Sequence, residues 1–217
     1  MHKLLNHPRG GVIFTLMSLV GFLLFGTAVG VLMTPSSEVL GERLGELVCL
    51  QVAFTPERAL SIVSSFSANE QEAIQNVLIP SDLALAWGYG LFLAGLIGLL
   101  TRRLEGQWFR AGAIIIWAPI AASVLDCIED LFLFDIVSIV LLAPEMQIPW
   151  FVPLIAGIAA TLKYTALVII TPVFAVAGCV KAFQSNHSIG DLFLYAFLLI
   201  NVVMFVARPV PQIIGCL

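Results

Sequence analysis

Long apolar segments of the chain contain a group of ionisable residues whose types and spacing could do chemistry. Asp126, Glu129 and Asp130 follow one another at i, i+3 and i+4, so a helix places their carboxylates on one face. Lys163 lies in the next apolar segment and supplies one ammonium group. Ionisable groups inside a membrane are costly, and they mark ion pairs, proton relays and cation paths. Carboxylates also serve as general acids and bases.

The composition predicts that these residues belong to a membrane protein. Hydrophobic residues make up 60% of the 217 residues, charged residues only 11%, and the mean hydropathy is +1.03. Average soluble domains hold about 45–50% apolar and about 25% charged residues. The formal net charge of -4 argues against nucleic-acid binding, because nucleic-acid binders usually carry a basic face. We therefore expect the lipid bilayer as a partner and no nucleic acid.

The apolar segments predict an all-α transmembrane bundle of about five spanning helices in a single membrane domain, residues 1–217. A spanning helix needs about 20 apolar residues, and a longer one must tilt or kink. The predicted spans are residues 11–33, 83–100, 112–142, 150–180 and 191–207. The first span is longer than a signal-peptide core, so we expect it to be retained.

Glycines predict where these helices approach one another closely. The second span carries four of them, at Gly88, Gly90, Gly95 and Gly98. In the first span, Gly26 and Gly30 form a pair of small residues four apart, which is a common helix-packing pattern.

Residues 34–81 are rich in acids, and they predict short amphipathic helices outside the membrane. Thr55 followed by Pro56 is typical of an N-cap with proline at the first helical position. Ser67 and Glu70 have the spacing of a capping box, which opens a second short helix. We expect this segment to lie on the membrane surface or to cap the bundle.

The distribution of Lys and Arg predicts a cytoplasmic N-terminus and an extracytoplasmic C-terminus, because cytoplasmic loops carry the excess of these residues. This orientation puts on the cytoplasmic side Lys3, Arg9, Arg102, Arg103, Arg110 and Lys181. It leaves on the other side Arg43, Arg58 and Arg208. It also puts Cys49 and Cys216 on one side, so a disulfide between them is compatible with the sequence.

The same topology places Lys163 level with Asp126. At about 1.5 Å per residue, Asp126 lies about 18 Å and Lys163 about 20 Å below the outer boundary of the membrane core. We therefore predict that these two side chains are in contact. Three acids against one lysine leave an excess of negative charge, which is relieved if an acid stays protonated or a cation or water enters. Other polar residues that could line this interior are Tyr89, Thr161, Tyr164 and Asn201.

Three short stretches carry a resemblance to a known group. They are Phe54-Thr55-Pro56-Glu57-Arg58-Ala59, Asp82 with Tyr89, and Asp126-Cys127-Ile128-Glu129-Asp130. The chain thereby resembles a group of small bacterial integral membrane proteins with an extracytoplasmic PERA helix and an intramembrane D-x-x-E-N motif. Asp130 stands where that motif commonly has Asn. The resemblance implies a bacterial inner (plasma) membrane location and draws attention to Asp126 and Glu129, but it implies no substrate.

Three hypotheses for the function remain open. The first is a non-enzymatic accessory, assembly or scaffold protein, with other membrane-protein subunits as partners and an Asp126–Lys163 tie between two helices. The second is a small proton- or cation-linked transporter or channel that uses Asp126 and Glu129. The third is an intramembrane lipid-modifying enzyme. The sequence lacks the P-loop, zinc-protease, nucleophile-elbow and dinucleotide motifs, and we predict no catalytic residue, cofactor or metal site.

Three structural features distinguish these hypotheses. A continuous polar cavity that reaches Asp126 favours transport. A dry contact between Asp126 and Lys163, with a large apolar lateral face, favours the accessory role. A cleft open to lipid near Glu129 and Asp130 favours the enzyme.

Overall fold

The computed structural model describes residues 2–32, 43–143, 145–185, 194–200 and 215–216. These residues form helices and no strand, which confirms the prediction of an all-α bundle. Four of the described helices are long and apolar enough to cross a membrane: Gly10–Val31, Ala68–Thr101, Gly106–Leu142 and Phe151–Gln184. Of the predicted fifth span, residues 194–200 are helical, and 191–193 and 201–207 lie outside the described residues.

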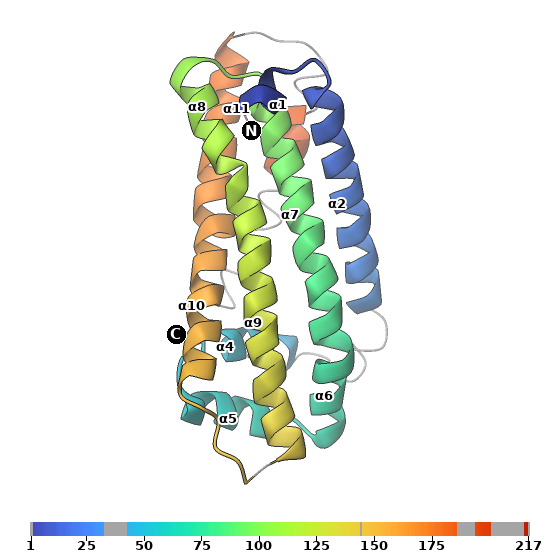
Figure 1. Cartoon of the computed structure of the whole chain (residues 1–217), viewed down its shortest axis with the longest axis vertical. Coiled ribbons are helices and arrows are strands. Elements are labelled where there is room, and N and C mark those ends of the chain that lie inside the picture. The colour runs from blue at the N-terminus through green and yellow to red at the C-terminus, as the bar shows by residue number, and fades with distance from the viewer. Residues whose placement is uncertain (1, 33–42, 144, 186–193, 201–214, 217) are drawn as a thin grey trace.

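The long helices lie side by side in one elongated bundle (Figure 1). Helix α2 (Gly10–Leu32) packs on α7 (Ile79–Thr101), α7 packs on α9 (Trp117–Leu142), and α9 packs on α10 (Phe151–Tyr164). The short helices α4 (Leu44–Gln51) and α5 (Pro56–Ser65) cross one end, which we call the cap end. The opposite end carries α1 (His2–Asn6) and the start of α8 (Gly106–Ile115), and we call it the basic end.

Glycines let α2 and α7 touch through their backbones. A Cβ atom added at Gly88 would lie 2.5 Å from the backbone nitrogen of Phe25, and one at Gly95 would lie 2.6 Å from the carbonyl oxygen of Phe14. The predicted close approach at the glycines of the second span is therefore present. By contrast, a Cβ atom added at Gly26 or Gly30 would meet no described atom within 4 Å, so the close approach of α2 to α7 does not depend on this pair.

The second spanning helix begins earlier than residue 83. Ser67 and Glu70 form the predicted capping box, but the helix that they open, α6 (Ala68–Ala73), continues through η2 (Ile74–Leu78) into α7. Residues 68–81 therefore belong to the spanning helix rather than to a separate cap helix.

A π-helical turn lets this helix continue past Pro80. Proline lacks an N–H, and its ring clashes with the carbonyl four residues before it in a regular α-helix. That carbonyl belongs to Asn76, which lies in the wider turn of η2. The irregular turn thus lies where the proline disturbs the helix, and the chain stays helical on both sides of it.

Two other prolines have the same local effect. Pro172 follows the π-helical segment η3 (Thr165–Ile170), which joins α10 to α11 (Thr171–Ser185). Pro119 follows the break at Ile116 that separates α8 from α9. Both long segments thus contain an irregular turn just before a proline, which is where helices kink. Figure 1 shows both as nearly continuous rods.

The cap helices are fastened to the bundle at several points. Thr55 caps α5 as predicted, its side chain accepting a hydrogen bond from the N–H of Arg58, and Pro56 opens the helix. The buried residues of α5, Ala59 and Val63, belong to the same apolar cluster as Ile136 and Val137 of α9. Cys49 of α4 forms a disulfide with Cys216, with 5.0 Å between their Cα atoms. The cap end is therefore tied both to the bundle and to the last described residues of the chain.

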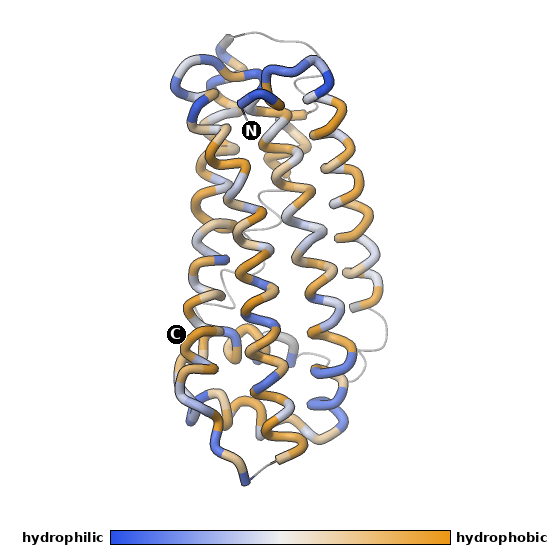
Figure 2. Tube along the Cα trace, viewed as in Figure 1, coloured by the Kyte–Doolittle hydropathy of each residue, from blue (hydrophilic) through white to orange (hydrophobic). Residues whose placement is uncertain are grey.

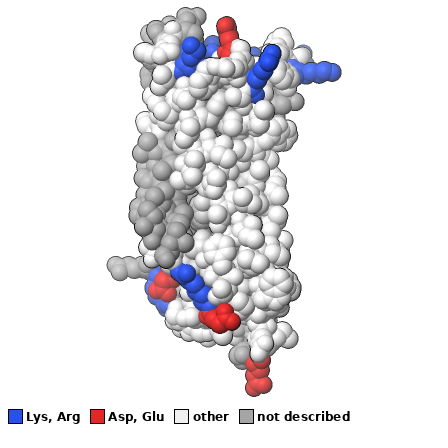
Figure 3. Space-filling view, turned by 90° about the vertical axis from the view of Figure 1, so that its left-hand side faces the viewer, with Lys and Arg blue, Asp and Glu red and all other residues white. Residues whose placement is uncertain are grey.

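The surface between the two ends is apolar. Figure 2 shows hydrophobic positions along the long helices and hydrophilic positions gathered at both ends, with some hydrophilic positions inside the half nearer the cap end. On the face drawn in Figure 3, charged side chains gather at the two ends and the flank between them is uncharged. Large apolar side chains are exposed along this length, among them Leu23, Leu131 and Val173. This distribution is that of helices whose outer surface faces lipid.

Candidate functional site

A buried ion pair joins α10 to α9. The Nζ atom of Lys163 lies 2.5 Å from Oδ1 of Asp126 and 2.7 Å from Oε2 of Glu129. Only 4% of Lys163, 3% of Asp126 and none of Glu129 is exposed. The contact between Lys163 and Asp126 that the helix register predicts is thus present.

The helices explain why these groups meet. Residues 143–150 join α9 to α10, so the two helices run antiparallel and pack along much of their length. Asp126 and Lys163 are 37 residues apart and lie at similar depths below this connection. Asp126 and Glu129 differ by nearly one turn, so both carboxylates reach the same ammonium group.

Tyr89 brings α7 into the same cluster. Its hydroxyl donates a hydrogen bond to Oδ2 of Asp126 at 2.8 Å and also lies 3.3 Å from the carbonyl oxygen of Ala122. The crossing of α7 and α9 is close here, because Ser123 Oγ donates to the carbonyl of Ala86 at 2.7 Å. A Cβ atom at Gly90 would lie 1.9 Å from that same Oγ atom, so a larger residue there would displace the Ser123 hydroxyl from this hydrogen bond. Each oxygen of Asp126 therefore has a partner from a different helix.

Asp82 completes a group of three aspartates. One carboxylate oxygen from each of Asp82, Asp126 and Asp130 lies within 4.8 Å of the others. Asp82 lies on α7, seven residues before Tyr89, so the two side chains share a helix face after two turns. The sequence prediction left Asp82 out of the cluster because it put the start of the helix at residue 83. The i, i+7 spacing from Tyr89 is the signal that could have included it.

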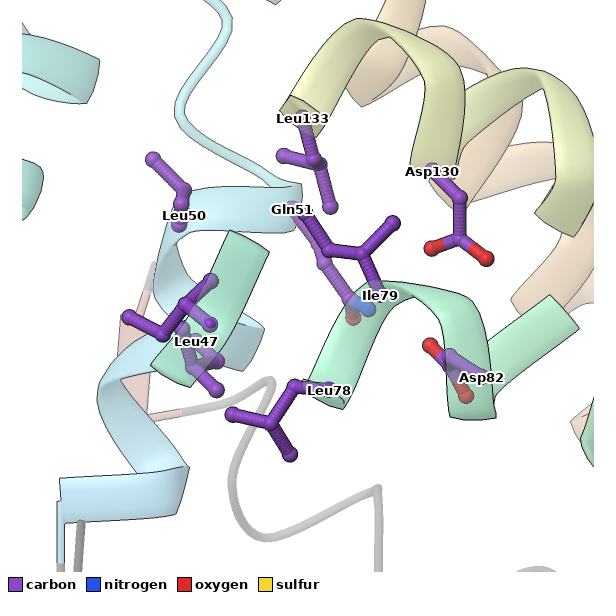
Figure 4. A pocket seen from close by; sticks show the side chains of 9 residues that line it. Leu47, Leu50, Gln51, Leu78, Ile79, Asp82, Asp130 and Leu133 are labelled. Carbon is purple, nitrogen blue, oxygen red and sulfur yellow. The ribbon is translucent and has the colours of Figure 1, made fainter. Parts of the chain in front are cut away.

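A small pocket opens onto this group from the cap end. It has a volume of about 130 Å³, and its lining comes from α4, η2, α7 and α9: Leu47, Leu50, Gln51, Ile74, Leu78, Ile79, Asp82, Asp130 and Leu133. Figure 4 shows the carboxylates of Asp82 and Asp130 turned toward each other from α7 and α9. Most of the other lining side chains are aliphatic, so the two aspartates supply the charge of this pocket.

Several carboxylate oxygens of the cluster have no hydrogen-bond partner. Oδ2 of Asp130 is buried without one, and only 1% of that residue is exposed. Neither oxygen of Glu129 accepts a hydrogen bond, although Oε2 is within ion-pair distance of Lys163, because the two groups lack hydrogen-bond geometry. A buried charge without a partner is expensive. The arrangement is therefore one that protons or a cation would stabilise.

The other predicted lining residues have different surroundings. Thr161 is exposed, and its hydroxyl donates to the carbonyl of Gly157 at 2.7 Å, so it does not line the interior. The reason is helical geometry, since a residue two positions from Lys163 points to the opposite side of α10. Tyr164 donates its hydroxyl to Oε1 of Gln51 at 2.6 Å and thereby links α10 to α4. Asn201 lies outside the described residues.

The comparisons with known proteins assign no relative. No family model, no curated protein and no solved structure matches this chain. Its class follows from its own features: the long apolar helices indicate a membrane protein. Within the described residues, the charged groups are concentrated in one buried cluster of α7, α9 and α10 and at the two ends of the bundle.

Proposed function

We propose that this chain is a non-enzymatic membrane scaffold or accessory protein, in which the charged cluster holds the helices together. The observation that carries this proposal is the buried contact of Lys163 with Asp126. Both side chains are almost wholly buried, at 5% and 4% exposure, and the phenol of Tyr89 occupies the remaining oxygen of Asp126. The ion pair and this hydrogen bond together tie three helices, α7, α9 and α10.

The packing in the half of the bundle nearer the basic end supports the same role. From Asp126 toward the basic end, the interior is filled by large apolar side chains, including Phe92, Ile97 and Leu100 of α7 and Ile116. A proton or cation that reached the cluster from the cap end would meet this apolar layer. The exposed flank is also apolar, as a scaffold that contacts lipid or other membrane-protein subunits requires.

The orientation and location are part of the proposal. Lys3, Arg9, Arg102 and Arg103 belong to the basic end, which supports a cytoplasmic assignment of that end. The Cys49–Cys216 disulfide lies at the cap end, and disulfides persist in oxidising compartments, which supports an extracytoplasmic assignment of the cap. With the resemblance to bacterial proteins, we place the chain in an inner (plasma) membrane, with its N-terminus cytoplasmic.

A proton- or cation-linked transporter is the second candidate. Oε1 of Glu129 and Oδ2 of Asp130 favour it, because they are buried without a partner and such groups occur along ion paths. A transporter would also need a permeation path for the proton or cation from Asp126 to the basic end, through the apolar layer that contains Phe92 and Ile97.

Flux through proteoliposomes separates the two candidates. Wild-type protein, Asp126→Asn and the control Asp135→Asn would be inserted at matched density, with proton and cation uptake followed by internal dyes. Asp135 is an exposed acid on the same helix, so its substitution controls for loss of one charge. We expect all three to match protein-free vesicles, and only Asp126→Asn to unfold at a lower temperature. Uptake by the wild type that Asp126→Asn abolishes would replace the scaffold proposal with a transporter.

A further inference from the structure

We propose that Asp82 and Asp130, with the carboxylate of Asp126 beside them, form a binding site for a divalent metal cation, and that Ca²⁺ fits it best. This site goes beyond the scaffold role, since that role needs only the ion pair with Lys163. The three carboxylates come from two helices, α7 and α9, that pack on one another just below the cap.

The spacing of the carboxylates fits Ca²⁺. Their oxygens lie within 4.8 Å of one another. Calcium binds oxygen at about 2.3–2.6 Å, so two ligands on opposite sides of the ion are separated by about 4.6–5.2 Å. Magnesium binds at about 2.0–2.1 Å, which gives at most about 4.2 Å between opposite ligands. Ca²⁺ is therefore compatible with this upper limit, and its flexible coordination tolerates ligands that are not ideally placed, whereas Mg²⁺ demands a near-ideal octahedron at a shorter distance.

The hydrogen bonding of Asp130 points independently to a ligand. Its Oδ2 atom is buried and unpartnered, and its carboxylate turns toward Asp82 across the pocket (Figure 4). Two carboxylates that face each other without a bridging donor repel, and burial strengthens the repulsion. Lys163 relieves it only in part, because its ammonium group is placed between Asp126 and Glu129. A cation between Asp82 and Asp130 would supply the missing positive charge.

The pocket has room for a cation together with water ligands. Its volume of about 130 Å³ exceeds that of a single water, whose share of liquid volume is about 30 Å³. An ion and several waters can thus occupy it, as Ca²⁺ requires because it takes 6–8 oxygen ligands, of which carboxylates supply only some. Leu47, Leu50 and Gln51 of α4 line one side of the pocket, so the ion would lie under this cap helix. Once bound, it would join α7 to α9 at a second level, beside the Tyr89–Asp126 hydrogen bond.

Equilibrium binding of radioactive Ca²⁺ tests the site directly. Full-length protein in lipid nanodiscs would be stripped with a chelator, dialysed and titrated with CaCl₂, and in parallel with MgCl₂ as competitor. The variants are Asp130→Asn and Asp82→Asn, with Asp135→Asn as the exposed control on α9. We expect about one Ca²⁺ per chain in the wild type and in Asp135→Asn. We expect affinity to fall at least about tenfold in each site variant, because affinity depends on ligand charge count.

Unfolding in the presence of chelator distinguishes a cation site from a merely structural aspartate. Asp130→Asn removes one of two repelling carboxylates, so the chelated variant should unfold at a higher temperature than the chelated wild type, and Ca²⁺ should no longer raise it. Three results overturn the proposal. They are no saturable Ca²⁺ binding by the wild type, Ca²⁺ binding by both site variants with the affinity of the wild type, or a chelated Asp130→Asn that is less stable than the chelated wild type. Failure here leaves the Lys163–Asp126 tie intact, since flux and ion-pair measurements test that tie separately.

Discussion

Lys163 of α10 and Asp126 of α9 are joined at 2.5 Å in the interior of the bundle, 37 residues apart in the chain. Glu129 is the second carboxylate beside the same ammonium group, at 2.7 Å. Breaking a buried pair by removal of one partner costs about 3–5 kcal/mol, because the other charge stays buried without compensation. The stability of the bundle should therefore depend on this lysine more strongly than on any exposed charge.

Tyr89→Phe should weaken the cluster without altering its charge. The substitution removes the hydroxyl that donates to Oδ2 of Asp126 at 2.8 Å and keeps the ring. Hydrogen bonds to charged groups contribute about 1.5–3 kcal/mol, so we expect a loss of that size in the free energy of unfolding in detergent. The same substitution in an Asp126→Asn background should cost clearly less. Equal costs in the two backgrounds would show that the two groups are not coupled.

Gly88→Ala should destabilise the contact of α2 with α7, whereas Gly26→Ala should not. The new methyl group at residue 88 would lie 2.5 Å from the backbone nitrogen of Phe25, which can move only if the helix moves. Overpacking of this kind costs about 1–3 kcal/mol. At Gly26 nothing described lies within 4 Å, and alanine favours helix, so that variant should be as stable as the wild type or more so. Thermal unfolding in one detergent compares them, and equal melting temperatures would contradict the packing.

Much of the bundle could be predicted from periodicity and hydropathy. The long helices follow from segments of about 20 or more predominantly apolar residues, and the caps at Thr55 and Ser67 follow from local side-chain chemistry. The equal depth of Lys163 and Asp126 in the bundle follows from the rise per residue in two antiparallel helices. Each of these features depends on residues that are close in the sequence or on the short connection between α9 and α10.

The remaining features depend on contacts that the sequence does not encode locally. Pro80 would normally end a helix, and only the wide turn of η2 allows Asp82 to extend the same face as Tyr89. Thr161 was a candidate by polarity alone, and its angular position on α10 places its side chain on the exposed face of the helix. The pairing of Cys49 with Cys216 spans 167 residues, and no sequence pattern gives the distance between them.

The disulfide should hold the cap end in place. Replacement of Cys49 and Cys216 together by Ser removes the covalent link between α4 and the last described residues of the chain. Loss of a disulfide typically costs about 2–5 kcal/mol, and we expect that loss in the free energy of unfolding. Peptide mapping without reductant should recover the two cysteines in one linked fragment. Cys127→Ser, which alters a free cysteine, is the control and should leave both the map and the stability unchanged.

Acid should loosen α4 through Glu46. A side-chain hydrogen bond from Arg43 lowers the pKa of the Glu46 carboxyl below its ordinary value of 4.5. A carboxyl whose pKa is lower in the folded state stabilises the fold above its unfolded pKa, and this contribution is lost as the pH falls through the folded value. The protein should thus become modestly less stable below about pH 4.5. Glu46→Gln should remove that part of the pH dependence, and an unchanged acid slope would rule out this contact as its source.

A charge-swap cycle at Asp126 and Lys163 is the measurement that tests the central claim most directly. The variants Asp126→Lys, Lys163→Asp and the double swap would be compared by unfolding in nanodiscs, at matched expression. Each single change places like charges beside each other, so each should lose at least about 3 kcal/mol or fail to accumulate as folded protein. The double swap restores opposite charges and should recover most of that loss. Single variants as stable as the wild type, or a double swap no better than the singles, would contradict the ion pair as the tie between α9 and α10.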